Sequence, residues 1–377
     1  MQPQNTLATM PTRLPGADLL RVLATVGVIT IHASQWPAVR NATEWYFWTD
    51  FDQAARWAVP AFLVLSGIVL AYRYGGTQLP SGFLIRRARR SLLPFVVWSP
   101  VYLLIGLFVT HAIPQSSSAI IAWSLAGAGH LWFLLIIPQF YVLYMFWPRR
   151  RAWIPAVTLA ALAVQLALCG WRLYGTVPAG LGWSLVMDHG FEFFPFWIGY
   201  FAVGLWLGTI GATRNGRSPV LGRISLAAIP LAAVPYMLWG TTGAPHPDYG
   251  RGTGGFLVPL LAPLAVAICV TCILCGGAWM VHRSTRVRTI VATLSTYSLG
   301  IYIVHPFLLN IPGQLLGGVF AYTGEPWSVL PEVLLVMTTL LMSLLCVRLL
   351  AATVMATTLG VPVAPLPRPA WLGGARP

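Results

Sequence analysis

Apolar runs long enough to cross a lipid bilayer alternate with short polar breaks along almost the whole chain of 377 residues. A helix needs about 20 predominantly apolar residues to span about 30 Å of hydrocarbon. Ten windows reach that length, at approximately residues 17–37, 54–74, 91–111, 130–148, 153–173, 191–210, 221–240, 256–280, 290–311 and 329–356. The pattern predicts an all-α polytopic integral membrane protein with about ten transmembrane helices.

The arginines fall mainly in alternate polar breaks. Four breaks are rich in arginine, at residues 86–90, 149–151, 214–223 and 283–288, whereas the breaks between them carry most of the acidic residues. Loops rich in arginine are retained on the cytoplasmic side of a membrane. With an even number of spans, this asymmetry predicts that both termini are cytoplasmic.

The two ends of the chain differ from its apolar middle. The first apolar run lacks an Ala-x-Ala cleavage site and is followed by nine more runs, so we interpret it as a retained helix and not as a signal peptide. Prolines near the carboxyl end, from Pro362 to Pro369, disfavour a helix there. We therefore expect a cytoplasmic segment at residues 1–16, a transmembrane domain at 17–356 and a Pro-rich cytoplasmic tail at 357–377.

The composition excludes an ordinary soluble domain. Hydrophobic residues make up 57% of the chain and charged residues only 8%, whereas soluble domains carry about 25% charged residues. The net charge of +14 comes from 23 arginines in a chain without lysine. Because these arginines flank apolar runs, we interpret them as orientation and interface residues and expect no nucleic-acid partner.

The five cysteines lie in apolar runs and indicate no disulfide framework. Cys269, Cys272 and Cys275 recur every three residues, a spacing compatible either with a metal or iron–sulfur site or with small packing residues of a helix. The same apolar run offers no nearby histidine or carboxylate, so we expect packing and no metal.

Ionisable residues within the first apolar run are its most informative feature. Arg21 and His32 are eleven residues apart, and eleven helical steps of about 100° return nearly to the same face, about 16 Å further along the axis. Asp18 lies within a quarter turn of both. Ionisable groups inside a span usually face a water-filled cavity or a partner, which makes this stripe a functional-site hypothesis.

The residues alone leave two interpretations of the stripe open. In a structural one, Asp18 and Arg21 form an ion pair at the cytoplasmic interface, and His32 extends towards the outer surface. In a catalytic one, His32 accepts a proton from an attacking hydroxyl, because an imidazole titrates near neutral pH.

The arginines that precede the third span also allow two interpretations. They are either a signal for membrane orientation, or they bind a phosphorylated cytosolic ligand. In the second case Arg87 and Arg90, three apart on one helix face, form paired hydrogen bonds to phosphate, with Arg86 in the same cluster.

Polar residues near later spans complete the set of candidates. His130 opens the fourth span, where histidine is common at an interface. His305 lies deep in the ninth span before Pro306 and is expected to line a cavity. Asp188 and Glu192, near the sixth span, fit either a solvated loop or a binding surface.

Several of these residues lie in segments that resemble the membrane acyltransferase 3 family. Residues 16–21 followed by His32 are similar to its first-helix signature, and Arg87-x-x-Arg90 before Pro94 is similar to its basic third-helix motif. The other similar segments are residues 56–67, 130–134, 194–200 and 298–306, the last of which contains Tyr302-x-x-His305. All six occur in the expected order on the predicted frame of ten spans.

The resemblance implies an integral-membrane O-acyltransferase that moves an acyl group, commonly acetyl from acetyl-CoA, to a hydroxyl of a sugar or glycan. It implies that His32 is the essential histidine, that Arg21 is its motif partner and that Arg87 and Arg90 belong to the donor site. With the topology, it predicts a multi-pass protein of the bacterial plasma membrane. Asp18 and Arg21 would lie along the path between cytosolic acyl-CoA and His32.

We expect the acceptor, a glycan or a glycosylated small molecule, at the outer side. The candidate substrate-binding residues are Asp188, Glu192, His130, Tyr302 and His305. A transporter or flippase of lipid-linked sugars is the alternative from another class, because it also needs polar groups at the midplane and cytoplasmic arginines. A structural scaffold explains the spans but not the charges in the first one.

Overall fold

The computed structural model describes residues 14–35, 51–75, 78–108, 129–148, 150–174, 192–209, 219–242, 259–323 and 329–363. All regular structure in these ranges is helical. The main helices are α1 (Pro15–Ala33), α4 (Ala58–Tyr74), α5 (Phe83–Phe108), α7 (Trp132–Phe146), α8 (Ile154–Tyr174), α10 (Ile198–Thr209), α11 (Pro219–Thr242), α12 (Leu261–Thr271), α13 (Gly277–Val281), α14 (Thr285–Thr323) and α15 (Val329–Leu350). The predicted class, an all-α polytopic membrane protein, is confirmed.

Nine helical segments of the described chain are long and apolar enough to cross a membrane. The sixth predicted span differs from the others. It consists of a 3₁₀ turn, η4 (Phe194–Phe196), and α10, which has only 12 residues and is too short to cross 30 Å of hydrocarbon. Hydropathy overstated this span because most side chains of α10 are buried by other helices, and a buried helix is apolar on all sides.

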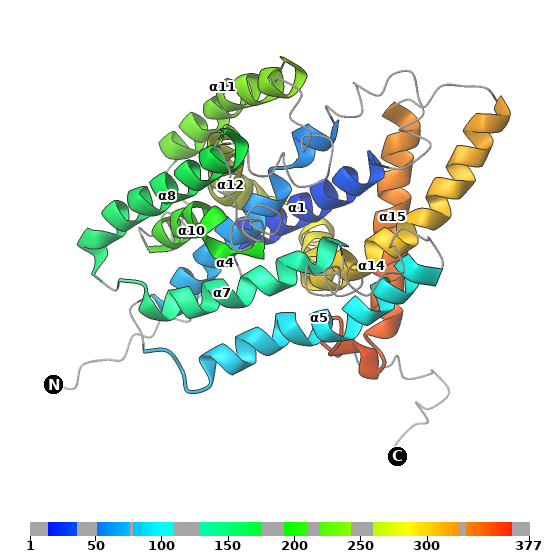
Figure 1. The fold of residues 1–377 in the computed structure, drawn as a ribbon, viewed down its shortest axis with the longest axis horizontal. Coiled ribbons are helices and arrows are strands. Elements are labelled where there is room, and N and C mark those ends of the chain that lie inside the picture. Colours follow the sequence, from blue (N-terminus) through cyan, green and yellow to red (C-terminus); the bar gives the residue numbers. More distant parts are fainter. Residues whose placement is uncertain are drawn as a thin grey trace.

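Helix α1 lies in the middle of the molecule (Figure 1). It contacts α4 and the π-helical turn η6 (Cys272–Gly276) on one side, and α14 and α15 on the other. Arg21 and His32 both belong to this one continuous helix. The ionisable groups of the first apolar run therefore lie among other helices of the protein.

Glycines bring the central helices unusually close together. A Cβ atom added at Gly67 of α4 would clash with the carbonyl oxygen of Phe201, and one added at Gly204 of α10 would clash with that of Val64. A Cβ atom at Gly16 would lie 2.5 Å from the carbonyl oxygen of Ile273 in η6. Small residues let helices approach in this way within membranes, and here they bring α4 close to α10 and α1 close to η6.

The chain after α15 turns back beneath α5. Trp98 of α5 donates a hydrogen bond from Nε1 to the carbonyl oxygen of Thr358, at 3.1 Å, and Leu359 is fully buried. The packed structure thus extends beyond the boundary predicted at residue 357, because apolar side chains of this segment reach the core before the prolines begin. Residues 1–13 and 364–377 lie outside the described part of the chain.

Candidate active site

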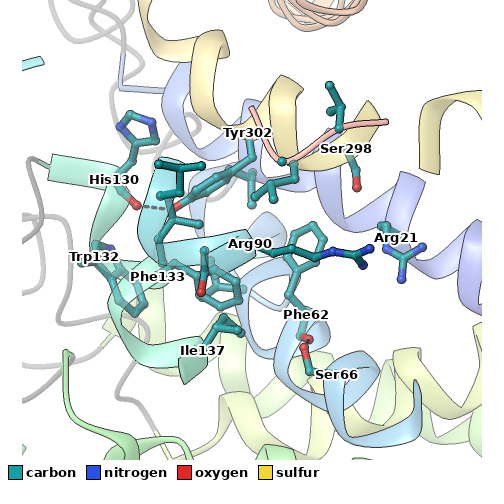
Figure 2. Close-up of a pocket in the computed structure, with 18 of the residues that line it drawn as sticks. Arg21, Phe62, Ser66, Arg90, His130, Trp132, Phe133, Ile137, Ser298 and Tyr302 are labelled. Atoms are coloured by element: carbon teal, nitrogen blue, oxygen red, sulfur yellow. Dashed lines mark hydrogen bonds between the residues drawn. The ribbon is translucent and has the colours of Figure 1, made fainter. Parts of the chain in front are cut away.

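A cavity of about 1110 Å³ lies between α1, α4, α5, α7 and α14. Arginines from α1 and α5 line one end, and His32 and His130 line the other. Figure 2 shows Arg21 and Arg90 on one side of this space and His130, Tyr302 and Trp132 on the opposite side. The cavity therefore connects the two groups of residues that the sequence singled out.

The first group comprises the five cavity-lining arginines: Arg21, Arg86, Arg87, Arg89 and Arg90. Four of them come from the first turns of α5, and the described part of the cavity wall has no carboxylate to neutralise them. Guanidinium groups arranged around one space bind phosphate with paired hydrogen bonds. This end of the cavity is suited to a polyanionic ligand.

Two tyrosines hold Arg87 in place. Its Nη2 donates a hydrogen bond to the hydroxyl of Tyr74 at 3.3 Å. Its guanidinium carbon lies 5.6 Å from the centre of the Tyr74 ring and 5.9 Å from that of Tyr141. Cation–π contacts of this kind orient an arginine without neutralising its charge, so Arg87 remains available to an anion.

Arg21 is positioned differently, by a carboxylate and a serine. Its Nη1 lies 3.3 Å from Oδ1 of Asp18 and donates to Oγ of Ser295 at 2.7 Å. Ser295 in turn donates to the same Asp18 oxygen at 2.5 Å. Asp18 is buried and does not line the cavity. Arg21 therefore faces the cavity, whereas Asp18 does not line it and holds the guanidinium of Arg21 in place through the ion pair.

Apolar side chains line the middle of the cavity. They include Val59 and Phe62 of α4 and Phe133 and Ile137 of α7. The rings of Phe62 and Phe133 are 6.0 Å apart, and Phe133 lies 6.1 Å from the ring of Tyr302. A ligand that extends from the arginines towards the histidines would pass these aromatic walls (Figure 2).

Three histidines from separate segments meet at the far end. His32 comes from α1, His130 from the 3₁₀ turn η1 (Gly129–Leu131) and His305 from α14. The ring of His32 is 5.1 Å from that of His305 and 6.1 Å from that of His130, and the latter two rings are 5.7 Å apart. His32 and His130 line the cavity, whereas His305 is fully buried.

Backbone carbonyls fix two of these rings. Nδ1 of His305 lies 2.8 Å from the carbonyl oxygen of Tyr302, and Nε2 of His130 lies 3.3 Å from that of Ile303. Because a carbonyl oxygen only accepts, each of these nitrogens donates. The hydroxyl of Tyr302 also donates to the carbonyl oxygen of His130 (Figure 2), which joins α14 to η1.

The model of the acyltransferase 3 family, described as an acyltransferase domain, matches residues 14–357. The chain belongs to this family. No curated protein and no solved structure matches the chain. The match contains the five cavity-lining arginines and all three histidines, whereas Gly360, Val361 and Pro362 of the cavity wall lie just beyond it.

The position of two predicted substrate-binding residues requires correction. His305 of the acyltransferase does not line the cavity, because the packing of α14 buries it completely. Glu192 is also buried, beside η4, and is absent from the described cavity wall; its carbonyl oxygen accepts a hydrogen bond from Nε2 of Gln139 at 2.9 Å. His130 and Tyr302 do line the cavity, and Asp188 lies outside the described residues.

The histidine end of this acyltransferase has two further features. The ring of Tyr102 packs against His130 with centroids 4.7 Å apart. Asp52 and Arg56 form a buried ion pair with 2.5 Å between Oδ2 and Nη2. The sequence pattern could have indicated the ion pair, since opposite charges four residues apart meet on a helix. No sequence pattern distinguishes Tyr102 from other tyrosines in apolar runs.

Proposed function

We propose that this membrane acyltransferase moves an acetyl group from cytosolic acetyl-CoA to a hydroxyl of a sugar or glycan at the outer side of the bacterial plasma membrane. The observation that supports this most is the single cavity that joins an arginine cluster to an imidazole. Neither end alone would suffice, because binding the polyanionic donor needs positive charge, whereas activating the acceptor hydroxyl needs a group that accepts its proton. No metal takes part in the proposed reaction.

The arginine end is proposed to bind the donor. CoA is polyanionic and cytosolic, and Arg86, Arg87 and Arg90 would bind its phosphates. The pantetheine arm would then extend past Phe62 and Phe133 and bring the thioester towards His32. Arg21, held by Asp18 and Ser295, would lie beside this path. The arginine-rich breaks support a cytoplasmic location for this end.

At the histidine end, His32 is proposed to act as the general base. It takes the proton of the acceptor hydroxyl while that oxygen attacks the thioester carbonyl carbon. The carbon–sulfur bond breaks, the acetyl group remains on the acceptor oxygen, and the CoA thiolate leaves. His32 then returns the proton to the thiolate. His130 and Tyr302 would contact the acceptor from the cavity wall.

Acetyl transfer by the purified full-length protein tests this proposal. The protein, in lipid nanodiscs, is supplied with radiolabelled acetyl-CoA and with glycan fractions from the bacterium that produces it. Labelled glycan is then measured. We expect label that depends on the protein and that falls about 1,000-fold in His32→Ala, as expected for loss of a general base. Thr30→Ala is the matched control, since Thr30 lies on the same helix, is absent from the cavity wall and donates to the carbonyl oxygen of Val26.

The results that would contradict the proposal are equally specific. Full activity in His32→Ala would remove His32 from the chemistry. Protein-dependent movement of lipid-linked sugars without consumption of acetyl-CoA would favour the flippase. Comparison of surface glycans by mass spectrometry, from cells with and without the protein, identifies the acceptor hydroxyl.

A further inference from the structure

We propose that His305 is a positioning residue, whose Nε2 accepts a hydrogen bond from His32 and thereby fixes the tautomer in which the other nitrogen of His32 faces the cavity. This inference rests on the proposed role of His32 as the base. It gives His305 a part in the reaction without contact with either substrate.

The protonation of the His305 ring follows from its surroundings. Nδ1 lies 2.8 Å from the carbonyl oxygen of Tyr302 and 3.2 Å from that of Ile301, so it carries the hydrogen and donates. In a neutral imidazole the opposite nitrogen then has a free lone pair. Nε2 of His305 is therefore an acceptor.

In the geometry of the structure, no donor of the described chain is hydrogen-bonded to this acceptor, although it is completely buried. The proposed bond from His32 therefore requires a rotation of the His32 ring. A buried acceptor without a donor is unfavourable by about 1–3 kcal/mol, so such groups are rare. Because Nδ1 faces the backbone of the preceding helical turn, Nε2 points away from that backbone. Of the two other histidine rings, that of His32 is the nearer, with centroids 5.1 Å apart.

The ring separations decide between His32 and His130 as the donor. An imidazole nitrogen lies roughly 1.1 Å from the ring centre, given ring bonds of about 1.35 Å. Rings separated by 5.1 Å, as for His32 and His305, can bring their nitrogens to about 2.9 Å. For His130 and His305, at 5.7 Å, the closest approach is about 3.5 Å, which is longer than a typical hydrogen bond. His130 also has its Nε2 at the carbonyl oxygen of Ile303.

The consequence for the reaction is a fixed direction of proton transfer. With one nitrogen of His32 donating to His305, the other presents its lone pair to the acceptor hydroxyl. When His32 takes that proton it becomes an imidazolium, and its bond to His305 becomes charge-assisted and stronger. The proton stays on His32 until it passes to the leaving thiolate.

Nitrogen NMR of the full-length protein in nanodiscs, labelled with ¹⁵N-histidine, tests the tautomers directly. Protonated and unprotonated ring nitrogens resonate far apart, and the variants His32→Gln and His305→Gln assign the two residues among the seven histidines of the chain. We expect a single neutral tautomer for His32 and a protonated Nδ1 for His305. A His305 that is protonated at Nε2, or a His32 that populates both tautomers equally, would overturn the proposal without any measurement of activity.

Two substitutions of His305 separate positioning from folding. In His305→Asn, the side-chain amide can still donate to the carbonyl oxygen of Tyr302 but offers no acceptor at the position of Nε2. We expect mixed tautomers of His32 and a kcat about 100-fold lower, within the range for misplaced acid–base catalysis, with a KM for acetyl-CoA changed less than about twofold. His305→Gln can place an amide oxygen near that position and should retain at least about a tenth of kcat.

Asn310→Ala on the same helix is the matched control, because Asn310 bonds to the carbonyl oxygens of Pro306 and Phe307 in its own helix. It should leave both kcat and the His32 signals unchanged. An unaltered His32 tautomer in His305→Asn would overturn the proposal. Unimpaired transfer by His32→Ala would instead contradict the proposed function, while the NMR result would still stand on its own.

Discussion

The two ends of the cavity hold their functional side chains in different ways. At the arginine end, charged side chains are held by side-chain groups, namely the tyrosine rings around Arg87 and the Asp18–Ser295 pair behind Arg21. At the histidine end, the imidazoles of His130 and His305 are held by backbone carbonyls of α14. The first arrangement keeps charge available to a ligand, and the second fixes which nitrogen donates.

This difference fits two tasks. Binding a polyanion needs positive charge that can adjust to phosphate groups, which long arginine side chains provide. Proton transfer needs one lone pair in one place, and buried donors and acceptors with fixed partners provide that rigidity. We therefore expect changes at the arginine end to act mainly on KM for the donor, and changes at the histidine end to act mainly on kcat.

The double substitution Arg87→Gln with Arg90→Gln should have the largest effect on donor affinity. Each charged hydrogen bond to phosphate contributes about 1.5–3 kcal/mol, so we expect KM for acetyl-CoA to rise about 100-fold while kcat at saturation changes less than about threefold. Steady-state kinetics in nanodiscs measures both. Arg223→Gln is the control, since Arg223 lies on α11 away from the cavity wall. A decrease in kcat without a rise in KM would contradict the assignment of donor binding to the arginine end.

Substitution of Ser295 should have an intermediate effect. Ser295→Ala removes the hydroxyl shared by Arg21 and Asp18, and loss of a buried hydrogen-bond partner destabilises a protein by about 1–3 kcal/mol. We expect a lower midpoint of thermal unfolding and a KM for acetyl-CoA about tenfold higher. Ser295→Thr keeps the hydroxyl and should recover most of both. If Ser295→Ala changed stability but not KM, Arg21 would have no part in donor binding.

The sequence predicted the parts of this site that lie on one helix. Arg21 and His32 share a face of α1 because of helix periodicity, and Arg87 and Arg90 share a face of α5 for the same reason. The convergence of His32, His130 and His305 was beyond such reasoning, because it depends on how α14 and η1 pack against α1. Hydropathy likewise could not distinguish a buried short helix such as α10 from a full span, since both are apolar throughout.

The burial of His305 illustrates the same limit. Its position in an apolar run before Pro306 fits a cavity-lining residue, and only the packing around α14 places it behind the wall. Ser295 is a similar case: a serine 277 residues from Asp18 along the chain completes the arrangement around Arg21. Contacts of this range are set by tertiary structure and leave no local pattern.

Ionic strength should separate the two ends without any substitution. Salt at 1 M reduces the Debye length from about 10 Å to about 3 Å, which weakens attraction between the arginines and a polyanionic donor. We expect KM for acetyl-CoA to rise several-fold between low and high salt, with kcat nearly constant because the histidine end is buried. The same titration with the double arginine variant should show a shallower rise. An equal salt dependence in both proteins would place the donor phosphates elsewhere.

The smallest effect is expected from Tyr74→Phe. This change removes the hydroxyl that accepts from Arg87 at 3.3 Å but keeps the ring over which the guanidinium lies. A partly exposed hydrogen bond of this kind contributes about 0.5–1.5 kcal/mol, so KM for acetyl-CoA should rise about threefold, with kcat and the midpoint of thermal unfolding unchanged. Tyr74→Leu removes the ring as well and should raise KM further, because the cation–π contact is then also lost. Equal KM values for Tyr74→Leu and the wild type would mean that Arg87 needs no support from this ring, and that the arginine end relies on charge alone.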